Sequence, residues 1–143
     1  MFKKMDHTVL VVKNMEEAIK FYSDMFRTKP WDRGIAEVPD AGFRMTMLPV
    51  GDHFIELVEP TKPESRHARH LRERGESIFG ICFFVEDYDS EVKAMKDKGF
   101  VVEEEIGATI LPGVKFRVAL VAPRPTREFW IELVDLASLP PMQ

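Results

Sequence analysis

Hydrophobic residues in the first part of the chain follow two patterns: short β-rich runs that are typical of strands, and one stretch with the spacing of a helix. Apolar residues concentrated over residues 5–12 predict a β-strand. From Met15 to Phe26 they recur at helical spacing, directly after Asn14 with Glu17 three residues on, which is a helix-start signal. Three further strands are predicted, separated by turn-forming residues, at 31–38, 42–49 and 53–59. The first part of the chain is therefore predicted to be a β-α-β-β-β unit.

The same pattern returns in the second half of the chain. Residues 80–97 repeat the strand and helix pattern of residues 7–24, and residues 131–134 repeat Ile-Glu-Leu-Val from residues 55–58. A half-length repeat in a short chain indicates two copies of one supersecondary unit, neither of which buries a core alone. The second copy is predicted to have a strand at 78–85, a helix at 87–98, and strands at 101–106, 114–122 and 128–134.

These elements predict an α+β fold of two tandem βαβββ modules in a single domain, residues 1–143. The first module spans residues 5–60 and the second spans residues 78–135. A basic connector at 61–77 is predicted to contain a short helix, and the tail at 136–143 to be loosely ordered.

Strand alternation assigns the side chains of each module to two faces. In the strand over residues 78–85 one alternating set is strongly apolar and is predicted to pack against the helix. His7 and Gly80, at equivalent positions of the repeat, then point to the opposite, concave side. Glu56 and Glu132 also repeat, each between apolar neighbours on its own face, which is unusual for a solvated carboxylate.

Composition narrows the class of protein. A hydrophobic content of 45% is enough for a real core, and a net charge of −4 does not favour nucleic acid or an anionic membrane as a partner. No apolar run is long enough to span a membrane. The single cysteine, Cys82, excludes an intramolecular disulfide, and the N-terminus has no signal-peptide pattern. The chain is therefore predicted to be cytoplasmic.

His7, Glu56 and Glu132 are candidate ligands of a divalent cation on the concave side. Glutamate oxygens and a neutral imidazole suit Mn²⁺, Co²⁺, Ni²⁺, Fe²⁺ or Zn²⁺ and do not select one of them. A metal-free interpretation is open at this point, in which the histidine is a satisfied interior residue and the glutamates are solvated. Repulsion between two carboxylates in apolar surroundings favours a cation.

Four segments carry a resemblance to a known family: DHTVLVVKNMEEAIKFY, FRMTMLPVGDHFIELVEP, HLRERGESIFGICFFVED and FWIELVD. Over residues 5–135 the chain resembles the vicinal oxygen chelate superfamily, which includes glyoxalase I, bleomycin-resistance proteins, extradiol dioxygenases and methylmalonyl-CoA epimerase. The epimerase branch is the most similar. The resemblance implies a cup-shaped domain around a metal, in a homodimer.

The four ligand positions of this family fall on His7, Glu56, Gly80 and Glu132. Three of them can coordinate a cation and the glycine cannot. Cys82 lies on the same face as Gly80, but two residues along a strand is nearly 7 Å at about 3.3 Å per residue, so it is not expected to replace the missing ligand directly. Water or a substrate oxygen is the expected occupant, and Gly80→His is expected to tighten metal binding.

The resemblance implies a metal-dependent lyase or isomerase for a small substrate with adjacent oxygens. The metal would stabilise an enolate, and Glu132 or a hydroxide held by the metal would move the proton. A methionine stands where the epimerase branch has its proton-transfer glutamate, which implies weak epimerase activity. The candidate walls of an apolar substrate pocket, which could equally be ordinary core, are Met45, Phe54, Cys82, Phe84 and Trp130.

Two other functions remain open. One is a metal-free ligand-binding or drug-sequestering protein of the bleomycin-resistance kind, and the other is oxygen chemistry at Fe²⁺. The connector is interpreted either as a patch for substrate phosphates, such as those of coenzyme A, or as an ordinary solvated helix. His53, His67 and His70 are expected to be exposed to solvent.

Overall fold

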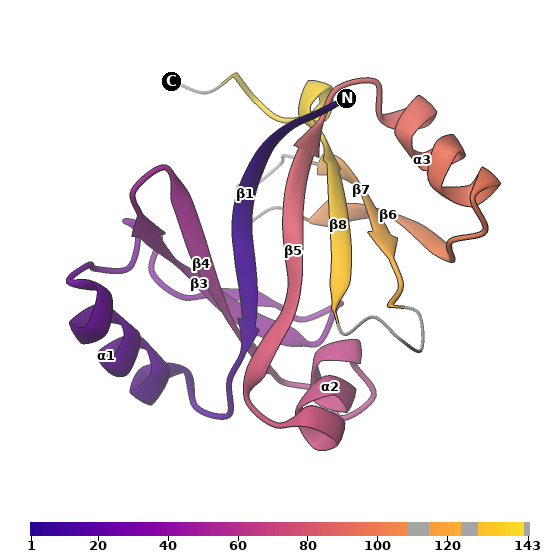
Figure 1. The fold of residues 1–143 in the computed structure, drawn as a ribbon. Helices are drawn as coiled ribbons and strands as arrows, with labels where there is room; N and C mark the ends of the chain where they lie inside the picture. Colours follow the sequence, from indigo (N-terminus) through magenta and orange to yellow (C-terminus); the bar gives the residue numbers. More distant parts are fainter. Residues whose placement is uncertain (109–114, 124–128, 142–143) are drawn as a thin grey trace. The chain divides into compact units, whose positions relative to one another are not determined.

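The computed structural model of the chain describes residues 1–108, 115–123 and 129–141 (Figure 1). The chain divides into two compact units, each described here by itself. The first unit is His7–Phe79, and the second unit is Gly80–Gln143 together with Met1–Asp6. Within the described residues, no helix has both the length and the apolar character needed to cross a membrane.

The first unit has the predicted β-α-β-β-β order, followed by the connector helix. Its elements are β1 (Phe2–Val11, which starts in the second unit), α1 (Met15–Phe26), β2 (Ala36–Val38), β3 (Phe43–Val50), β4 (His53–Pro60) and α2 (Arg66–Arg74). Strand β1 pairs with β4 in parallel, while β3 pairs antiparallel with both β4 and β2.

The second unit repeats this order. Its elements are β5 (Ser77–Val85, which starts in the first unit), α3 (Tyr88–Asp97), β6 (Val102–Ala108), β7 (Lys115–Val121), β8 (Trp130–Asp135) and the short 3₁₀ helix η1 (Leu136–Ser138). Strand β5 pairs with β8 in parallel, and β7 pairs antiparallel with β8 and with β6. The predicted strand starts Val114 and Glu128 lie outside the described residues. The α+β fold of two βαβββ modules is confirmed.

The two units agree in strand register as well as in element order. The equivalent register pairs are His7–Phe54 and Val9–Glu56 in the first unit, and Gly80–Trp130 and Cys82–Glu132 in the second. In both units the glutamate therefore lies in the last strand. Its register partner is the residue two places after His7 in the first unit and two places after Gly80 in the second. The repeat seen in the sequence is a repeat of strand pairing.

One face of the first unit's sheet is covered by α1 (Figure 1). The helix begins as predicted, because the Asn14 side chain accepts a hydrogen bond of 2.9 Å from the Glu17 amide. The apolar stripe of α1 packs on alternating sheet residues, and the buried members of this cluster are Val12, Met15, Ala18, Leu48 and Leu57. His7 and Glu56, which alternate with these strand residues, lie on the opposite face.

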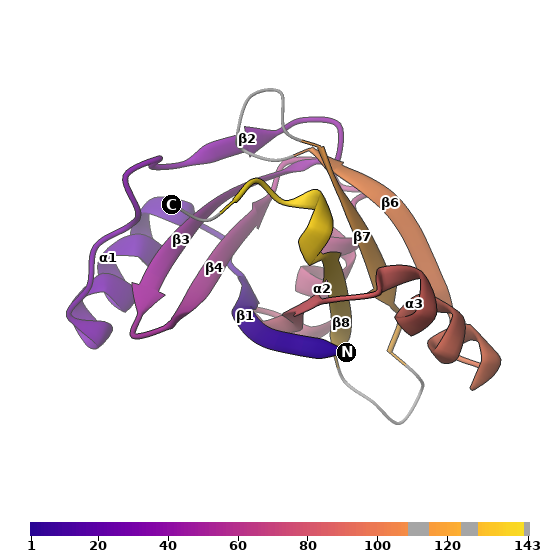
Figure 2. The same cartoon turned by 90° about the horizontal axis from the view of Figure 1, so that it is seen from above.

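Helix α3 covers the corresponding face of the second unit (Figure 2). Its Tyr88 and Val92 pack on Val85, Leu133 and further residues of that face. The predicted packing of the apolar set of β5 against a helix is confirmed, because Phe83 joins the same cluster. Cys82, Phe84, Val118, Leu120, Val134, Phe116, Trp130 and Leu139 form a separate apolar cluster on the other face.

Strand boundaries differ from the prediction by one or two residues in several places and by more at the starts of β1 and β2. The strand expected at 31–38 is shortened to β2, because Trp31 and Gly34 close a turn before it. The Trp31 indole N–H donates to the Gly34 carbonyl at 2.9 Å, and the Gly34 amide donates to the Trp31 carbonyl at 3.1 Å. Strand β1 begins at Phe2 rather than at residue 5. Its first residues belong to the second unit, where Phe2 makes an edge contact with Phe83 at 5.3 Å between ring centroids.

The expectation that His53, His67 and His70 are exposed is wrong for two of them. His67 and His70 are buried on the inner side of α2, whereas His53 is exposed as expected. The His67 ring lies 4.8 Å from Phe43 and 4.4 Å from Phe79, measured between centroids. His70 shares a hydrogen bond of 2.7 Å with the Ser77 hydroxyl, and burial lowers its pKa. The arginines of α2 lie mainly on the solvent-facing side of the helix, so the histidines lie on the side that faces the core.

An arginine links helix α1 to two strands of the sheet in the first unit. Arg44 on β3 donates to both carboxylate oxygens of Glu59 at 3.0 and 3.1 Å, and to Glu16 in the first turn of α1 at 2.9 Å. Glu59 also accepts from the Met15 amide at 2.5 Å, at the start of the same helix. We call this set the first arginine clamp; it fixes the beginning of α1 to the sheet.

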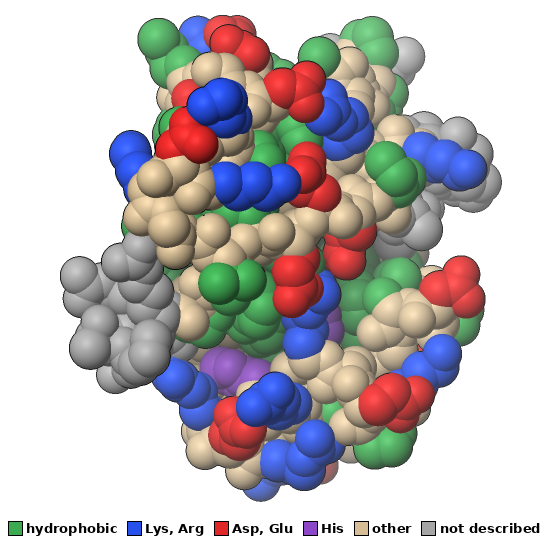
Figure 3. All heavy atoms as spheres, turned by 90° about the vertical axis from the view of Figure 1, so that its right-hand side faces the viewer, with side chains coloured by type: hydrophobic (Ala, Val, Ile, Leu, Met, Phe, Trp, Pro, Cys, Tyr) green, Lys and Arg blue, Asp and Glu red, His purple; other side chains and the backbone are tan. Residues whose placement is uncertain are grey.

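The second unit has an equivalent set, the second arginine clamp. Arg117 on β7 contacts Asp89 in the first turn of α3, and Asp135 at the end of β8 at 3.4 Å. The hydrogen bond from Arg117 lowers the pKa of Asp89, as the bond from Arg44 lowers that of Glu16. Elsewhere acidic and basic side chains are interspersed over the surface in view in Figure 3, in keeping with a net charge of −4.

We expect Arg44→Met to lower the free energy of unfolding by about 1.5–3 kcal/mol, because Glu59 loses its charged donors while it stays largely buried. Arg69→Met is the matched control: its partner Glu73 is exposed on α2, so a clearly smaller loss is expected. Urea unfolding of both variants measures the difference. Equal losses would contradict a special role for the first clamp.

Candidate functional site

The first unit brings two of the predicted metal ligands together. His7 on β1 and Glu56 on β4 lie on the sheet face opposite α1, offset by two residues across the parallel pair. The distance from His7 Nε2 to Glu56 Oε2 is 2.9 Å, and the two side chains are only 10% and 12% exposed. A carboxylate so far withdrawn from water needs a partner, which the imidazole provides.

This geometry fits two chemical states. In the first, a protonated imidazole donates to the carboxylate as an ion pair. In the second, both atoms coordinate one cation: two bonds of about 2.1 Å at a right angle place their donor atoms about 3 Å apart. The observed 2.9 Å is compatible with such neighbouring ligands. His7 and Glu56 therefore fit a divalent cation of the kind that binds nitrogen and oxygen.

The second unit places Glu132 on β8 between two neighbours in the sheet. Cys82 on β5 and Leu120 on β7 are its register partners. The Cys82 sulfur and a Glu132 carboxylate oxygen lie within 4.8 Å of each other. Sequence spacing related Cys82 only to Gly80 on its own strand; the pairing of β5 with β8 relates it directly to Glu132.

The two pairs, His7–Glu56 and Cys82–Glu132, belong to different units. The structure brings together the members of each pair. The convergence of His7, Glu56 and Glu132 on one cation joins residues of both units and stays a prediction.

Gly80 lies against the backbone of its neighbouring strand. A Cβ atom added at Gly80 would lie 2.6 Å from the Trp130 carbonyl oxygen and 3.2 Å from the Trp130 carbonyl carbon. Backbone that is held in a strand pair cannot move away as a side-chain end can. The expectation that Gly80→His adds a ligand therefore needs correction: the substitution has to displace β8, and we expect it to destabilise the second unit.

The predicted pocket residues divide between the units. Met45 and Phe54 lie in the first unit on the face that carries Glu56, and Met45 is buried. Its register partners are Val58 and Ala36, so this position has apolar neighbours on both strands. Cys82, Phe84 and Trp130 belong to one apolar cluster in the second unit, on the face opposite α3. Each unit thus has apolar side chains on the face of its glutamate, and their role as pocket walls stays a prediction.

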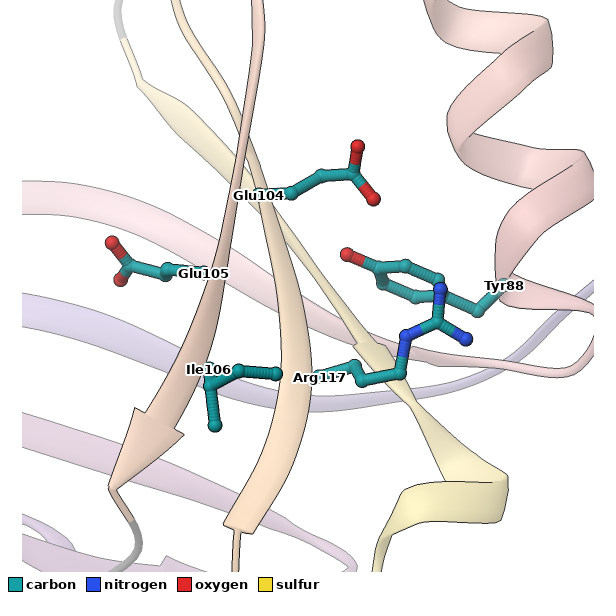
Figure 4. Close-up of a pocket in the computed structure, with 5 residues that line it drawn as sticks. All are labelled: Tyr88, Glu104, Glu105, Ile106 and Arg117. Carbon is teal, nitrogen blue, oxygen red and sulfur yellow. The ribbon is translucent and has the colours of Figure 1, made fainter.

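An open hollow on the α3 side of the second unit was not expected from the sequence (Figure 4). Its lining residues are Tyr88, Glu104, Glu105, Ile106 and Arg117. The Arg117 guanidinium lies 4.2 Å from the centre of the Tyr88 ring, and burial, helped by the Glu104 charge, raises the pKa of Tyr88 to about 12. None of the predicted site residues lines this hollow. Arg117 belongs to the second clamp, so its place in this hollow follows from its structural role, and we do not assign the hollow a ligand.

The family comparison agrees with the resemblance found in the sequence. The Glyoxalase/Bleomycin resistance protein/Dioxygenase superfamily matches residues 6–116. Because this match covers most of the 143 residues, the chain belongs to that superfamily. No curated protein matches the chain.

Solved structures with a similar fold include proteins with and without a known activity. A hypothetical protein from Bacillus halodurans is 27% identical with a TM-score of 0.79, over 92% of this chain and 93% of that one. Methylmalonyl-CoA epimerase from Mycobacterium tuberculosis is 24% identical with a TM-score of 0.76, over 92% and 86%. A variant of the Streptomyces coelicolor epimerase, in complex with 2-nitronate-propionyl-CoA, is 22% identical with a TM-score of 0.80, over 99% and 100%. At these identities the two epimerases show the fold alone.

We expect Gly80→Ala to lower the free energy of unfolding by about 1–3 kcal/mol, because the added methyl group meets the Trp130 backbone. Gly107→Ala is the control within the same unit, since there the added atom meets the far end of the Phe116 ring, and this side chain can swing away about its Cα–Cβ bond. Thermal or urea unfolding compares the two variants. A loss at Gly107 equal to or larger than that at Gly80 would contradict the close approach.

Proposed function

We propose that this protein is a metal-dependent lyase or isomerase in which His7, Glu56 and Glu132 hold a divalent cation. The observation that carries the proposal is the repeated glutamate: each unit of a glyoxalase-superfamily chain has one at the same register of its parallel strand pair. In the first unit the glutamate already lies 2.9 Å from an imidazole nitrogen. The arrangement of all 143 residues as one domain around this cation is part of the proposal.

The substrate is a small molecule with adjacent oxygens. A bound divalent cation supplies electrophilic stabilisation to an enolate oxygen. Glu132 moves the proton next to that oxygen, while Met45, Phe54, Cys82, Phe84 and Trp130 form the apolar walls that exclude water. The fold that the chain shares with two methylmalonyl-CoA epimerases supports this class of reaction. We also propose a homodimer, the assembly implied by the resemblance.

A second candidate is a metal-free ligand-binding protein of the bleomycin-resistance kind. The His7–Glu56 contact favours it, because an imidazolium and a carboxylate at 2.9 Å satisfy each other without a cation. Gly80, where the family has a ligand position, also leaves the second unit without an imidazole. Metal content separates the two candidates.

We expect the protein purified without added metal to contain close to one divalent cation per chain by elemental analysis. Glu56→Gln and Glu132→Gln should each weaken Co²⁺ binding at least about 10-fold, because each loses a charged ligand. Glu37→Gln is the matched control, since Glu37 is exposed on β2 and its substitution should leave binding unchanged. Isothermal titration calorimetry of the chelator-treated proteins gives the affinities.

Two results would overturn the metal proposal. One is wild-type protein that neither retains nor takes up Co²⁺, Zn²⁺ or Mn²⁺; the other is equal affinity in Glu56→Gln, Glu132→Gln and Glu37→Gln. Either result would favour the ligand-binding candidate.

We expect slow proton exchange at the α-carbon of methylmalonyl-CoA, even with Co²⁺ or Mn²⁺ present. Epimerisation needs a base on one face of the carbon and an acid on the other, and Met45 cannot serve as either. A missing general acid or base costs about 10²–10⁴-fold in rate. Deuterium incorporation followed by NMR measures the exchange. Fast exchange would contradict the argument from Met45 and assign the chain to the epimerases.

A further inference from the structure

Cys82 occupies a special position in the repeat. It is the residue of the second unit that corresponds to Val9, and it lies directly across the parallel strand pair from Glu132. Its sulfur is within 4.8 Å of a Glu132 carboxylate oxygen, and it is fully buried. The first unit has an imidazole near its glutamate; the second unit has a thiol.

We infer that Cys82 binds the cation as a thiolate beside Glu132, and so supplies the ligand that Gly80 lacks. This inference rests on the proposed metal-dependent function. At the right angle that fits His7 and Glu56, a sulfur bond of about 2.3 Å and an oxygen bond of about 2.1 Å place the two donor atoms about 3.1 Å apart. Rotation of the flexible Glu132 side chain can bring its oxygen to that distance from the Cys82 sulfur.

The close approach of Gly80 to Trp130 explains why the ligand comes from this position. A side chain at residue 80 would collide with the Trp130 carbonyl, at 2.6 Å from its first atom. Two residues further along β5, the side chain faces Glu132 instead of the Trp130 backbone. The second unit thus has room for a ligand at Cys82 and none at Gly80.

A thiolate in these surroundings needs a cation. The cluster around Cys82 consists of apolar residues, among them Val118, Leu120 and Val134, which do not stabilise an uncompensated negative charge. Metal binding deprotonates a coordinating thiol, and the proton leaves to the solvent. Without metal, Cys82 is an inert buried thiol.

The sulfur ligand also determines which metals bind well. Thiolates favour Zn²⁺ and Co²⁺, whereas sites made of carboxylates and water suit Mn²⁺ and Mg²⁺. A site with His7, Glu56 and Glu132 alone does not select strongly among these ions. Addition of Cys82 shifts the preference of the site toward Zn²⁺ and Co²⁺.

Co²⁺ titration of the reduced, chelator-treated full chain tests the inference by absorption spectroscopy. We expect a near-ultraviolet sulfur-to-Co²⁺ charge-transfer band in the wild type, together with the visible bands of bound Co²⁺. In Cys82→Ala and Cys82→Ser the charge-transfer band should vanish, Co²⁺ affinity should fall at least about 10-fold, and the preference for Zn²⁺ over Mn²⁺ should narrow. Calorimetry in two buffers of different ionisation heat should show about one proton fewer released per Zn²⁺ bound.

Val9→Ala is the matched control, because Val9 is equally buried and lies opposite Glu56 in the same register. It should keep the charge-transfer band. Visible Co²⁺ bands without a charge-transfer band in the wild type would overturn the role of Cys82 and leave the metal function intact. If wild-type protein binds no Co²⁺ at all, the proposed function fails together with the inference. The wild-type spectrum decides between these outcomes even if a cysteine variant does not fold.

Discussion

Parallel pairing between the first and last strands of each unit determines where the chemistry of this protein can lie. β1 pairs with β4, and β5 with β8, so each glutamate stands in the middle of its sheet rather than at an edge. A parallel pair with a covering helix buries one face in a core, which leaves only the other face for polar groups. The glutamates occupy that other face in both units. The low exposure of the Glu56 side chain is therefore a consequence of topology, and the His7 imidazole beside it is what makes this burial tolerable.

On the opposite, helix-covered face of each unit, the arginine clamps hold the helix to the sheet. Each clamp ties the first turn of a helix to the third strand of the βαβββ order and to the end of the last strand, through Glu16 and Glu59 in one unit and Asp89 and Asp135 in the other. The carboxylates near the helix N-termini also suit the helix dipole. Each unit therefore has charged residues on both faces of its sheet: those on the helix side hold the helix to the sheet, and those on the other side include the proposed metal ligands.

Most of the fold could be predicted because the periods of apolar residues survive in the structure. Met15 and Ala18 face the core of the first unit as their spacing requires, and Phe83 packs against the helix side of the second. The misses have physical causes. The turn at Trp31 depends on a side chain bonding to a carbonyl three residues on, which periodicity does not reveal. His67 and His70 are amphipathic, so neither charge nor hydropathy determines which way they point on a short helix rich in arginine.

The same limit applies to the candidate site and explains its asymmetry. Alternation along a strand places Gly80 and Cys82 on one face, but only the register between strands tells that Cys82, and not Gly80, faces Glu132. The glycine at residue 80 and the cysteine at residue 82 then have a common explanation. An imidazole at residue 80 would need the space that the Trp130 backbone occupies, whereas the Cys82 thiol lies within a packed apolar cluster and within 4.8 Å of a Glu132 carboxylate oxygen. The two units thus share one backbone plan and differ in the side chain near the glutamate, which is an imidazole in the first unit and a thiol in the second.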